Sequence, residues 1–236
     1  MGETERTVPG RSLFFPGPVR WAVEPLDDSL EPGTVLTALP VSDAVRARGA
    51  RLSRHRDRVA FAQARRLALA LAHDELQHGR GPSWAGTLAL VQSCPDCGGG
   101  DHGAPALVAP SPGADARRRI PLHVSWAHST GHVAAAVSVL PCGVDVETAG
   151  GPTPEFVLTT EEIARWDARG RPAALFRWWF TVKEAAVKCG LLDIDAFGEV
   201  SAEELGRCPE VVLYSSEVPG TGPGNGASAS VMVRNA

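Results

Sequence analysis

The sequence predicts a mixed α/β (α+β) protein, because helix-like and strand-like patterns both recur along its 236 residues. Residues 53–77 and 176–192 repeat apolar side chains at helical spacing. Residues 122–137 and 139–147 instead combine apolar runs with the period-2 alternation of strands. A chain of this length can form one large domain or two of about 100–120 residues each, with a core of normal size.

The composition narrows the class of protein. A formal net charge of −4 argues against a dedicated nucleic-acid binder, whose surface is usually basic. No apolar run reaches the ~18 residues that a membrane span needs, and the N-terminus lacks an apolar signal core. Five cysteines, an odd number in a chain with no export signal, fit reduced thiols. We therefore expect a cytoplasmic protein with neither nucleic acid nor a membrane as its partner.

The N-terminal part of the chain predicts a lead-in, a strand and two helices. Residues 1–18 are rich in proline and glycine and predict a loose lead-in. Residues 19–23 alternate as in a strand, and a helix is expected to start near Ser42, before the stronger one at 53–77. Eight arginines lie between residues 46 and 66. A solvated helix face explains any single one, whereas the cluster suits a phosphate or an acidic protein surface.

A Cys-x-x-Cys pair, Cys94 and Cys97, is followed by His102 across a run of glycines. Thiolates and imidazole are the usual ligands of zinc, so a zinc site is one interpretation. A fourth ligand at a matching spacing is missing, because the other cysteines are distant in the chain. The glycines favour another interpretation, a backbone that approaches a nucleotide or a phosphate closely.

An exposed loop is expected at residues 109–119, and it is the best candidate for a boundary. It divides the chain into an N-terminal half at 19–119 and a C-terminal half at 120–236. In the second half, residues 122–137 predict two strands joined by a turn. His128 sits at that turn, where a lone histidine is more often solvated than in contact with a ligand.

Two carboxylates one residue apart, Asp145 and Glu147, end the strand predicted at 139–147. A period of two residues places both on the same face of the strand. Neighbouring acids repel each other, so the pair needs a cation, a shared proton or a solvated edge. A bound divalent metal and a wet edge strand are both consistent with this segment alone.

The helix at 176–192 carries the remaining candidate residues. Glu184 and Lys188 are four residues apart, so they share a face and either pair with each other or meet one ligand. Lys183 and Lys188 are the only lysines among 23 basic residues. Lysine is a compact point charge that approaches a phosphate end-on, so its use at these two positions suggests a chemical role.

These residues together carry a resemblance to a known family. Asp145 and Glu147, followed about forty residues later by Lys183, Glu184 and Lys188, resemble the paired signatures of 4′-phosphopantetheinyl transferases. The sequence is closest to the larger surfactin-synthetase-activating (Sfp) type, in its actinomycete-like form. The segments at 94–105 and 124–133 also resemble intermediate motifs of that family, in the same order. The resemblance covers roughly residues 45–192.

The resemblance implies a fold and an activity. Members of the family are monomers of two similar small α/β halves related by a pseudo-twofold axis, with coenzyme A in the cleft between the halves. They transfer the phosphopantetheine arm of coenzyme A to a serine of an apo acyl or peptidyl carrier protein and release 3′,5′-ADP. Such carriers serve polyketide, non-ribosomal peptide or fatty acid synthesis.

The resemblance also implies catalytic and metal-binding roles. Asp145, Glu147 and Glu184 would hold Mg²⁺, or Mn²⁺, against the pyrophosphate, as hard cations bind carboxylates, phosphate and water. Glu184 is in addition the candidate general base for the carrier serine. Lys188 would touch the phosphate that is attacked, and Lys183 would support the site or lie close to it.

The coenzyme A contacts follow from the same comparison. Arg54 or Arg56, together with His128 and Ser129, would hold the 3′-phosphate. The turn from Gly103 to Pro105 would lie against the adenine, and the arginine-rich helix and the apolar residues near 176–180 would meet the acidic helix of a carrier.

The sequence departs from the family pattern at several positions. Ala104 stands where lysine or arginine is usual, Ala127 where serine is usual, and Phe180 where tryptophan is common. We expect altered coenzyme A binding more than lost chemistry, because the three acids and both lysines are present. Two other classes stay open: a different magnesium-dependent phosphotransferase, and a non-catalytic relative that binds coenzyme A or a carrier protein.

Overall fold

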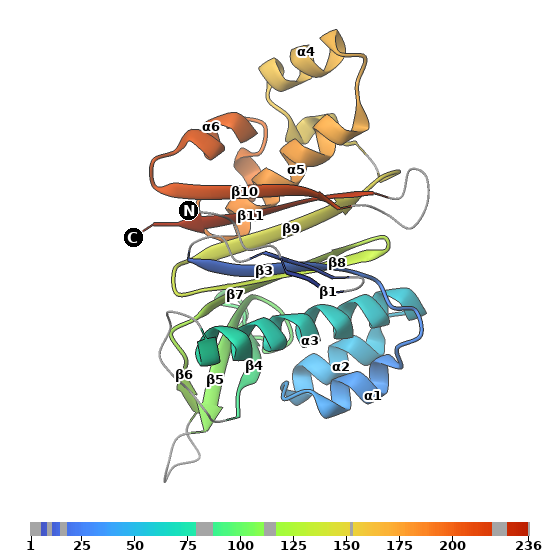
Figure 1. Ribbon diagram of the computed structural model, residues 1–236, viewed down its shortest axis with the longest axis vertical. Coiled ribbons are helices and arrows are strands. Elements are labelled where there is room, and N and C mark those ends of the chain that lie inside the picture. The colour runs from blue at the N-terminus through green and yellow to red at the C-terminus, as the bar shows by residue number, and fades with distance from the viewer. Residues whose placement is uncertain are drawn as a thin grey trace.

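The computed structural model describes residues 6–8, 11–14, 18–78, 87–110, 117–151, 153–218 and 226–235. Within these ranges the chain forms α-helices and three antiparallel sheets, which confirms the predicted mixed α+β class (Figure 1). The helices are α1 (Pro32–Ala38), α2 (Asp43–Arg51), α3 (His55–His78), α4 (Thr160–Ala168), α5 (Ala173–Lys188) and α6 (Ala202–Arg207). The strands are β1 (Arg6–Val8), β2 (Arg11–Phe14), β3 (Val19–Pro25), β4 (Ala89–Ser93), β5 (Ala104–Pro110), β6 (Arg117–Arg119), β7 (His123–Ser129), β8 (His132–Ser138), β9 (Cys142–Thr148), β10 (Val211–Val218) and β11 (Ala227–Arg234).

Two of the sheets form the centre of the molecule. Their strand orders are β1-β2-β3-β8-β7 and β10-β11-β9, and the third sheet has the order β4-β5-β6. In Figure 1 the helices α5 and α6 cover the outer side of the β9–β11 sheet, with α4 beyond α5, and α1 to α3 lie on the far side of the β3-β8-β7 sheet. The side chains of Val19 and Trp21 on β3 and of Val144 and Val146 on β9 share one buried cluster between the two sheets. Layered packing of this kind buries both faces of each central sheet.

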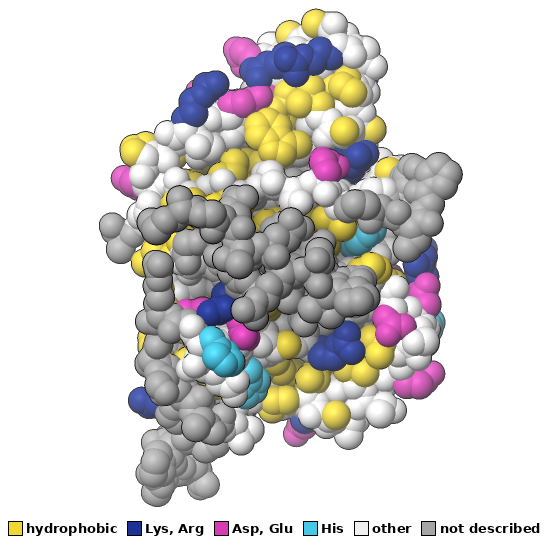
Figure 2. Space-filling view, viewed as in Figure 1, with side chains coloured by type: hydrophobic (Ala, Val, Ile, Leu, Met, Phe, Trp, Pro, Cys, Tyr) yellow, Lys and Arg dark blue, Asp and Glu magenta, His cyan; other side chains and the backbone are white. Residues whose placement is uncertain are grey.

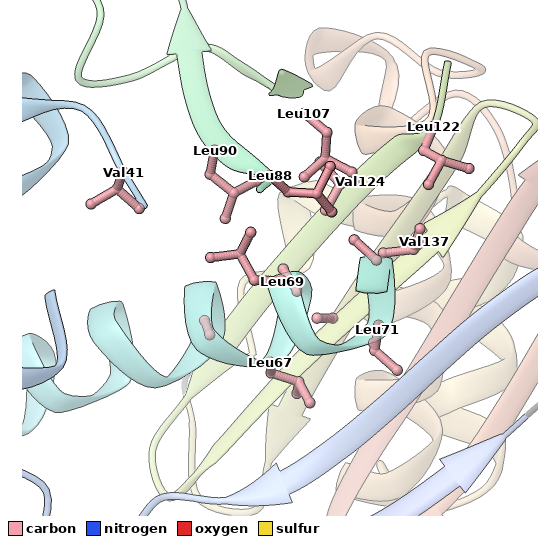
Figure 3. Packing of buried hydrophobic residues seen from close by; sticks show 14 of the residues in the cluster. Val41, Leu67, Leu69, Leu71, Leu88, Leu90, Leu107, Leu122, Val124 and Val137 are labelled. Carbon is pink, nitrogen blue, oxygen red and sulfur yellow. The ribbon is translucent and has the colours of Figure 1, made fainter. Parts of the chain in front are cut away.

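The helix α3 holds the lower half of the molecule together. The predicted helix at 53–77 is confirmed, since α3 spans His55–His78. Its Leu67 and Leu71 pack in one core with Leu90 of β4 and Leu107 of β5 (Figure 3). The three-stranded β4-β5-β6 sheet, which the sequence patterns did not predict, is therefore fixed to the main body through apolar side chains of α3.

Several predicted elements lie where they were expected. The strand predicted at 19–23 is β3, the two strands within 122–137 are β7 and β8, and the strand at 139–147 is β9. A capping box starts α4, in which Thr159 and Glu162 satisfy each other's backbone N–H groups. No helix in the described part of the chain is both long and apolar enough to cross a membrane.

Other expectations meet a different arrangement. The segment 1–18, expected as a loose lead-in, includes β1 and β2, which pair in sequence with β3; its residues 1–5, 9–10 and 15–17 lie outside the described residues. The expected loop at 109–119 is bounded by β5 and β6, with 111–116 outside the described residues. The sheets do not divide at 119 and 120, because β3 pairs with β8 along its whole length.

The helix α5 and the strand β9 approach each other to backbone distance at Gly143. A Cβ atom added there would lie 2.8 Å from Cys189 N and 2.9 Å from Lys188 Cβ, and still closer to the carbonyl oxygen of Ala185. Side chains never approach backbone atoms so closely without displacing them. Glycine is therefore required where α5 crosses β9.

We predict that Gly143→Ala destabilises the protein by ~1–3 kcal/mol or more, because the added methyl group meets backbone atoms that cannot move independently. Urea unfolding of the purified variant measures the change. Gly33→Ala in α1 is the matched control, since an added Cβ there meets nothing within 4 Å. An unfolding midpoint for Gly143→Ala equal to that of the control would contradict the close contact.

Candidate functional site

The strand β9 turns one face towards α5 and the other into the core. Val144 and Val146 lie in the apolar cluster between the two central sheets. Gly143 contacts α5, and Asp145 on the same face reaches Lys188 of that helix. The alternation predicted from the sequence is thus confirmed. Asp145 is buried rather than placed on a wet edge, which was the other interpretation of this strand.

Lys188 connects the strand with the helix. Its Nζ donates hydrogen bonds to Asp145 Oδ1 at 2.6 Å and to the carbonyl oxygen of Val144 at 3.2 Å, and it lies 3.9 Å from Glu184 Oε2. The second carboxylate oxygen of Asp145, Oδ2, is buried and has no hydrogen-bond partner among the described residues. A buried acceptor without a partner is costly, so this atom is available to a cation or a donor.

The three acids sit in an environment that disfavours their negative charge. Burial raises the pKa of Asp145, although Lys188 acts in the opposite direction. Burial, and then the charge of Asp145, raise the pKa of Glu147 to about 7. The pKa of Glu184 is also raised, mainly by burial. Lys188 alone therefore does not compensate three carboxylates, and a bound cation would restore their charged form.

The donor set fits a hard divalent cation. Carboxylate oxygens are the ligands that Mg²⁺ and Mn²⁺ prefer, and Asp145 Oδ2 is free to bind one. The ligand oxygens of Asp145, Glu147 and Glu184 do not all lie within 4.8 Å of one another, a spacing that only Cys94, Cys97 and His102 meet among the described residues. At least one acid would thus reach the ion through water or after a rotamer change. Mg²⁺ usually retains several water ligands.

Glu147 also lines a cleft that contains the residues predicted to hold the 3′-phosphate. The cleft has a volume of about 410 Å³. Its lining includes Arg54, Arg56, His128 and Ser129. The structure therefore brings together, beside the acids, residues that are separated by about ninety positions in the sequence. Since arginine and histidine side chains bind phosphates, one end of the cleft suits an anion and the other a cation.

Individual side chains in the cleft differ in how they are held. Ser129 Oγ donates to Glu147 Oε2 at 3.0 Å and accepts from the backbone N–H of Thr148 at 3.1 Å, so it fixes the Glu147 carboxylate. Arg56 pairs with Asp28 at 3.0 Å. Arg54 is exposed, and its guanidinium forms no ion pair with another described residue. Desolvation lowers the pKa of His128, although Asp57 acts against this.

A second, smaller hollow also reaches Glu147. Its volume is about 150 Å³, and its lining includes Pro154, Phe176, Phe180 and Arg177. Arg177 was not predicted as a site residue, and its Nε is buried without a hydrogen-bond partner among the described residues. No sequence pattern distinguishes it from the other arginines. Glu147 therefore stands between a basic cleft and a more apolar hollow.

Lys183 does not belong to this site. Its side chain is fully buried, and its Nζ donates to Glu162 Oε2 at 2.6 Å and to the carbonyl oxygens of Val157 and Phe197 at 2.8 and 2.7 Å. All three protons of the ammonium group are used inside the core. Lys183 was expected to contact coenzyme A, or to support the site or lie close to it; its ammonium group instead points into the core, away from the three acids.

Gly103 and Pro105 are not among the lining residues of the cleft. Gly103 is linked instead to Arg65 of α3 through Gln92, whose Nε2 donates to the Gly103 carbonyl oxygen at 3.1 Å and whose Oε1 accepts from Arg65 at 3.0 Å. Arg65 is buried, and burial lowers its pKa to about 9. Sequence reasoning counted it among the solvated arginines; the signal it missed is the i, i+4 spacing from Phe61, on whose ring the guanidinium rests.

The aromatic residues near 176–180 are mainly part of the core. Phe176 is only 2% exposed and packs against Trp166. The large apolar side chains that are exposed in the described residues are Phe156 and Ile194. On the face shown in Figure 2, hydrophobic side chains are exposed between basic and acidic ones over α4 and α5. Phe176 is therefore a core residue, and contact of the other apolar residues near 176–180 with a carrier stays a prediction.

The chain matches no known protein-family model, and a search among curated proteins found no match.

We predict that Glu147→Gln stabilises the metal-free protein at high pH. Since the folded-state pKa is about 7 and the ordinary value is 4.5, the folded protein holds a proton in this window that the unfolded chain has released. Stability from this group is therefore lost as the pH rises through the window. Thermal unfolding in the presence of a chelator, from below pH 4.5 to above pH 7, measures the effect. The unfolding temperature of the variant should rise relative to that of the wild type as the pH increases.

Glu199→Gln, which changes an exposed carboxylate, is the matched control and should follow the wild type at every pH. If Glu147→Gln also follows the wild type throughout, Glu147 does not titrate in the folded protein as its surroundings indicate.

We predict that Lys183→Met destabilises the protein by ~3–5 kcal/mol, because it leaves the buried carboxylate of Glu162 without its cation. Denaturant unfolding measures the loss. The double variant Lys183→Met/Glu162→Gln should lose less than the two single variants added together, since the pair is removed as a unit. Strict additivity would refute a direct Lys183–Glu162 pair.

Proposed function

We propose that this protein transfers the 4′-phosphopantetheine arm of coenzyme A to a serine of an apo acyl or peptidyl carrier protein, with Mg²⁺ as cofactor. The observation that carries the proposal is the cluster of Asp145, Glu184 and Lys188 beside Glu147, which lines a cleft that also holds Arg54. Carboxylates suit a hard cation and basic groups suit phosphates, so the site matches a substrate that has a pyrophosphate and a separate 3′-phosphate. The sequence resemblance gives this chemistry its specific substrate.

The arrangement of strands supports the two-half fold that the resemblance implies. In one sheet the sequence-ordered strands β3, β7 and β8 are arranged as β3-β8-β7, and in the other β9, β10 and β11 are arranged as β9-β11-β10. In both, helices are inserted between the first and second strands, and the last strand lies in the middle. We infer a pseudo-twofold repeat whose halves meet between β8 and β9, rather than at residues 119 and 120.

Within this proposal each side chain has a distinct task. Bound Mg²⁺ would neutralise charge on the pyrophosphate oxygens during an in-line displacement. Lys188, already directed at Asp145 Oδ1, would hold an oxygen of the attacked phosphate. Glu184, whose pKa is raised by burial, would accept the proton of the carrier serine at a carboxylate oxygen. Ser129 would keep the Glu147 carboxylate in place through its hydrogen bond.

The two hollows at Glu147 suit different parts of the coenzyme A molecule. Arg54 and His128 in the larger cleft suit the 3′-phosphate, which carries a negative charge. The smaller hollow, with Phe176 and Phe180, suits the less polar pantetheine arm. Of the departures from the family pattern, Ala127 is buried in the apolar cluster between the central sheets and removes no contact from the cleft. Since one chain supplies every group named, a monomer suffices.

The decisive experiment is intact-mass measurement of an apo carrier protein incubated with this protein, coenzyme A and Mg²⁺. We expect the carrier to gain the mass of phosphopantetheine. Asp145→Ala and Glu184→Gln should lower the transfer rate by about 100-fold or more, because they remove a metal ligand and the general base. Circular dichroism should show both variants folded.

Glu199→Gln is the matched carboxylate control and should transfer at the wild-type rate. Transfer by Asp145→Ala at the normal rate would exclude the metal assignment. Binding of coenzyme A without any mass gain, across several apo carriers, would instead favour the non-catalytic relative.

A further inference from the structure

The turn between β4 and β5 gathers three residues that the proposed function does not use. The sulfur atoms of Cys94 and Cys97 and a ring nitrogen of His102 all lie within 4.8 Å of one another, and no other group in the described ranges meets that spacing. Cys97 Sγ lies 3.2 Å from His102 Nε2. Two thiols and an imidazole at this distance form a compact set of soft and borderline ligands.

The backbone of the turn folds around the two sulfur atoms. The N–H of Gly98 donates to the Cys94 carbonyl oxygen at 2.9 Å, and the N–H of Cys94 donates to that of Gly99 at 2.9 Å. The N–H of Gly99 donates to Cys97 Sγ at 3.4 Å. A backbone N–H group directed at a sulfur atom stabilises thiolate, which is the form that binds metals.

His102 is held in the orientation that a metal ligand needs. Its Nδ1 is 2.6 Å from Asp101 Oδ1, so Nδ1 carries the proton and Nε2 presents its lone pair to the sulfur atoms. Asp101 is in turn fixed to α2, because Arg51 pairs with its carboxylate at 3.0 Å and Arg48 donates to its carbonyl oxygen at 2.9 Å. A carboxylate behind a histidine is the usual support of a protein metal ligand.

The glycines make room for this group. A Cβ at Gly99 would lie 2.8 Å from His102 Cε1 and 3.2 Å from Cys97 Sγ. Gly103 has a φ of +88°, and a Cβ there would lie 2.6 Å from Cys94 Cα. The close approach predicted from the glycine run thus brings the chain's own cysteines and histidine together, where the sequence had suggested a nucleotide or a phosphate.

We propose that Cys94 Sγ, Cys97 Sγ and His102 Nε2 bind a Zn²⁺ ion, with solvent in the fourth position. Sequence reasoning counted a fourth protein ligand as missing, but three protein ligands and water form a complete tetrahedral zinc site. Bound zinc would link β4 and β5 and, through Asp101, the adjacent helix α2. The proposal is independent of the acids on β9 and of the proposed transfer reaction.

The test is metal analysis of the full-length chain, purified under reducing conditions and then equilibrated with Zn²⁺ or Co²⁺. We expect one ion per chain, and the visible absorption of thiolate-bound Co²⁺. Cys94→Ser and Cys97→Ser should lose both. Cys208→Ser is the matched control, because Cys208 is an unpaired cysteine as partly buried as Cys94, and it should retain both. Asp101→Asn should weaken zinc affinity by roughly 10–100-fold through loss of support for His102.

Wild-type protein stripped of metal by a chelator provides a check that depends on no substitution. Its thermal unfolding temperature should fall and recover on addition of Zn²⁺, with no recovery on addition of Mg²⁺ alone. A fully reduced wild-type protein that takes up neither Zn²⁺ nor Co²⁺ would overturn the proposal. So would an equal loss of metal from Cys97→Ser and Cys208→Ser, or a Cys94–Cys97 disulfide in the freshly purified, metal-free protein.

Discussion

The contact of α5 with β9 at Gly143 is the constraint on which the acidic site depends. Only a residue without a side chain allows the helix to cross the strand at backbone distance. That distance lets Lys188 reach both Asp145 and the Val144 carbonyl oxygen from the helix. Successive residues of β9 face opposite sides of the sheet. Asp145 therefore faces α5, whereas Val144 and Val146 pack in the core between the two central sheets. Packing and chemistry are therefore specified by one seven-residue strand.

The helix α5 carries its two lysines, Lys183 and Lys188, on different sides. Five residues correspond to a rotation of about 140° around a helix, so Lys183 and Lys188 point to different sides although they are close in sequence. Lys183 is enclosed with Glu162 and two carbonyl oxygens, which satisfies a buried charge completely. Lys188 and Glu184, four residues apart, share the side that faces β9. Lysine thus stabilises the core on one side of α5 and holds the Asp145 carboxylate on the other.

The periodicity of the sequence predicted those elements whose conformation depends on residues close in the chain. The amphipathic helix α3 and the alternation of β9 are decided by neighbours within a few residues, and both agree with the sequence interpretation. The pairing of β3 with β8 joins segments that are distant in the sequence, which no single-sequence period reveals. The enclosure of Lys183 was missed for the same reason, since charge alone suggests exposure and only tertiary packing supplies its partners.

The acids on β9 and α5 and the arginines of the adjacent cleft carry opposite charges. Three carboxylates and one ammonium leave an excess of negative charge beside a cleft lined by arginines. A polyphosphate ligand would be attracted by Arg54 and repelled by Glu147 unless a cation lay between the acids and the ligand. Conversely, a divalent cation bound by the acids would leave coordination positions that phosphate oxygens fill better than water does. Metal and phosphate ligand should therefore bind cooperatively, each supplying the charge that the other end of the site lacks.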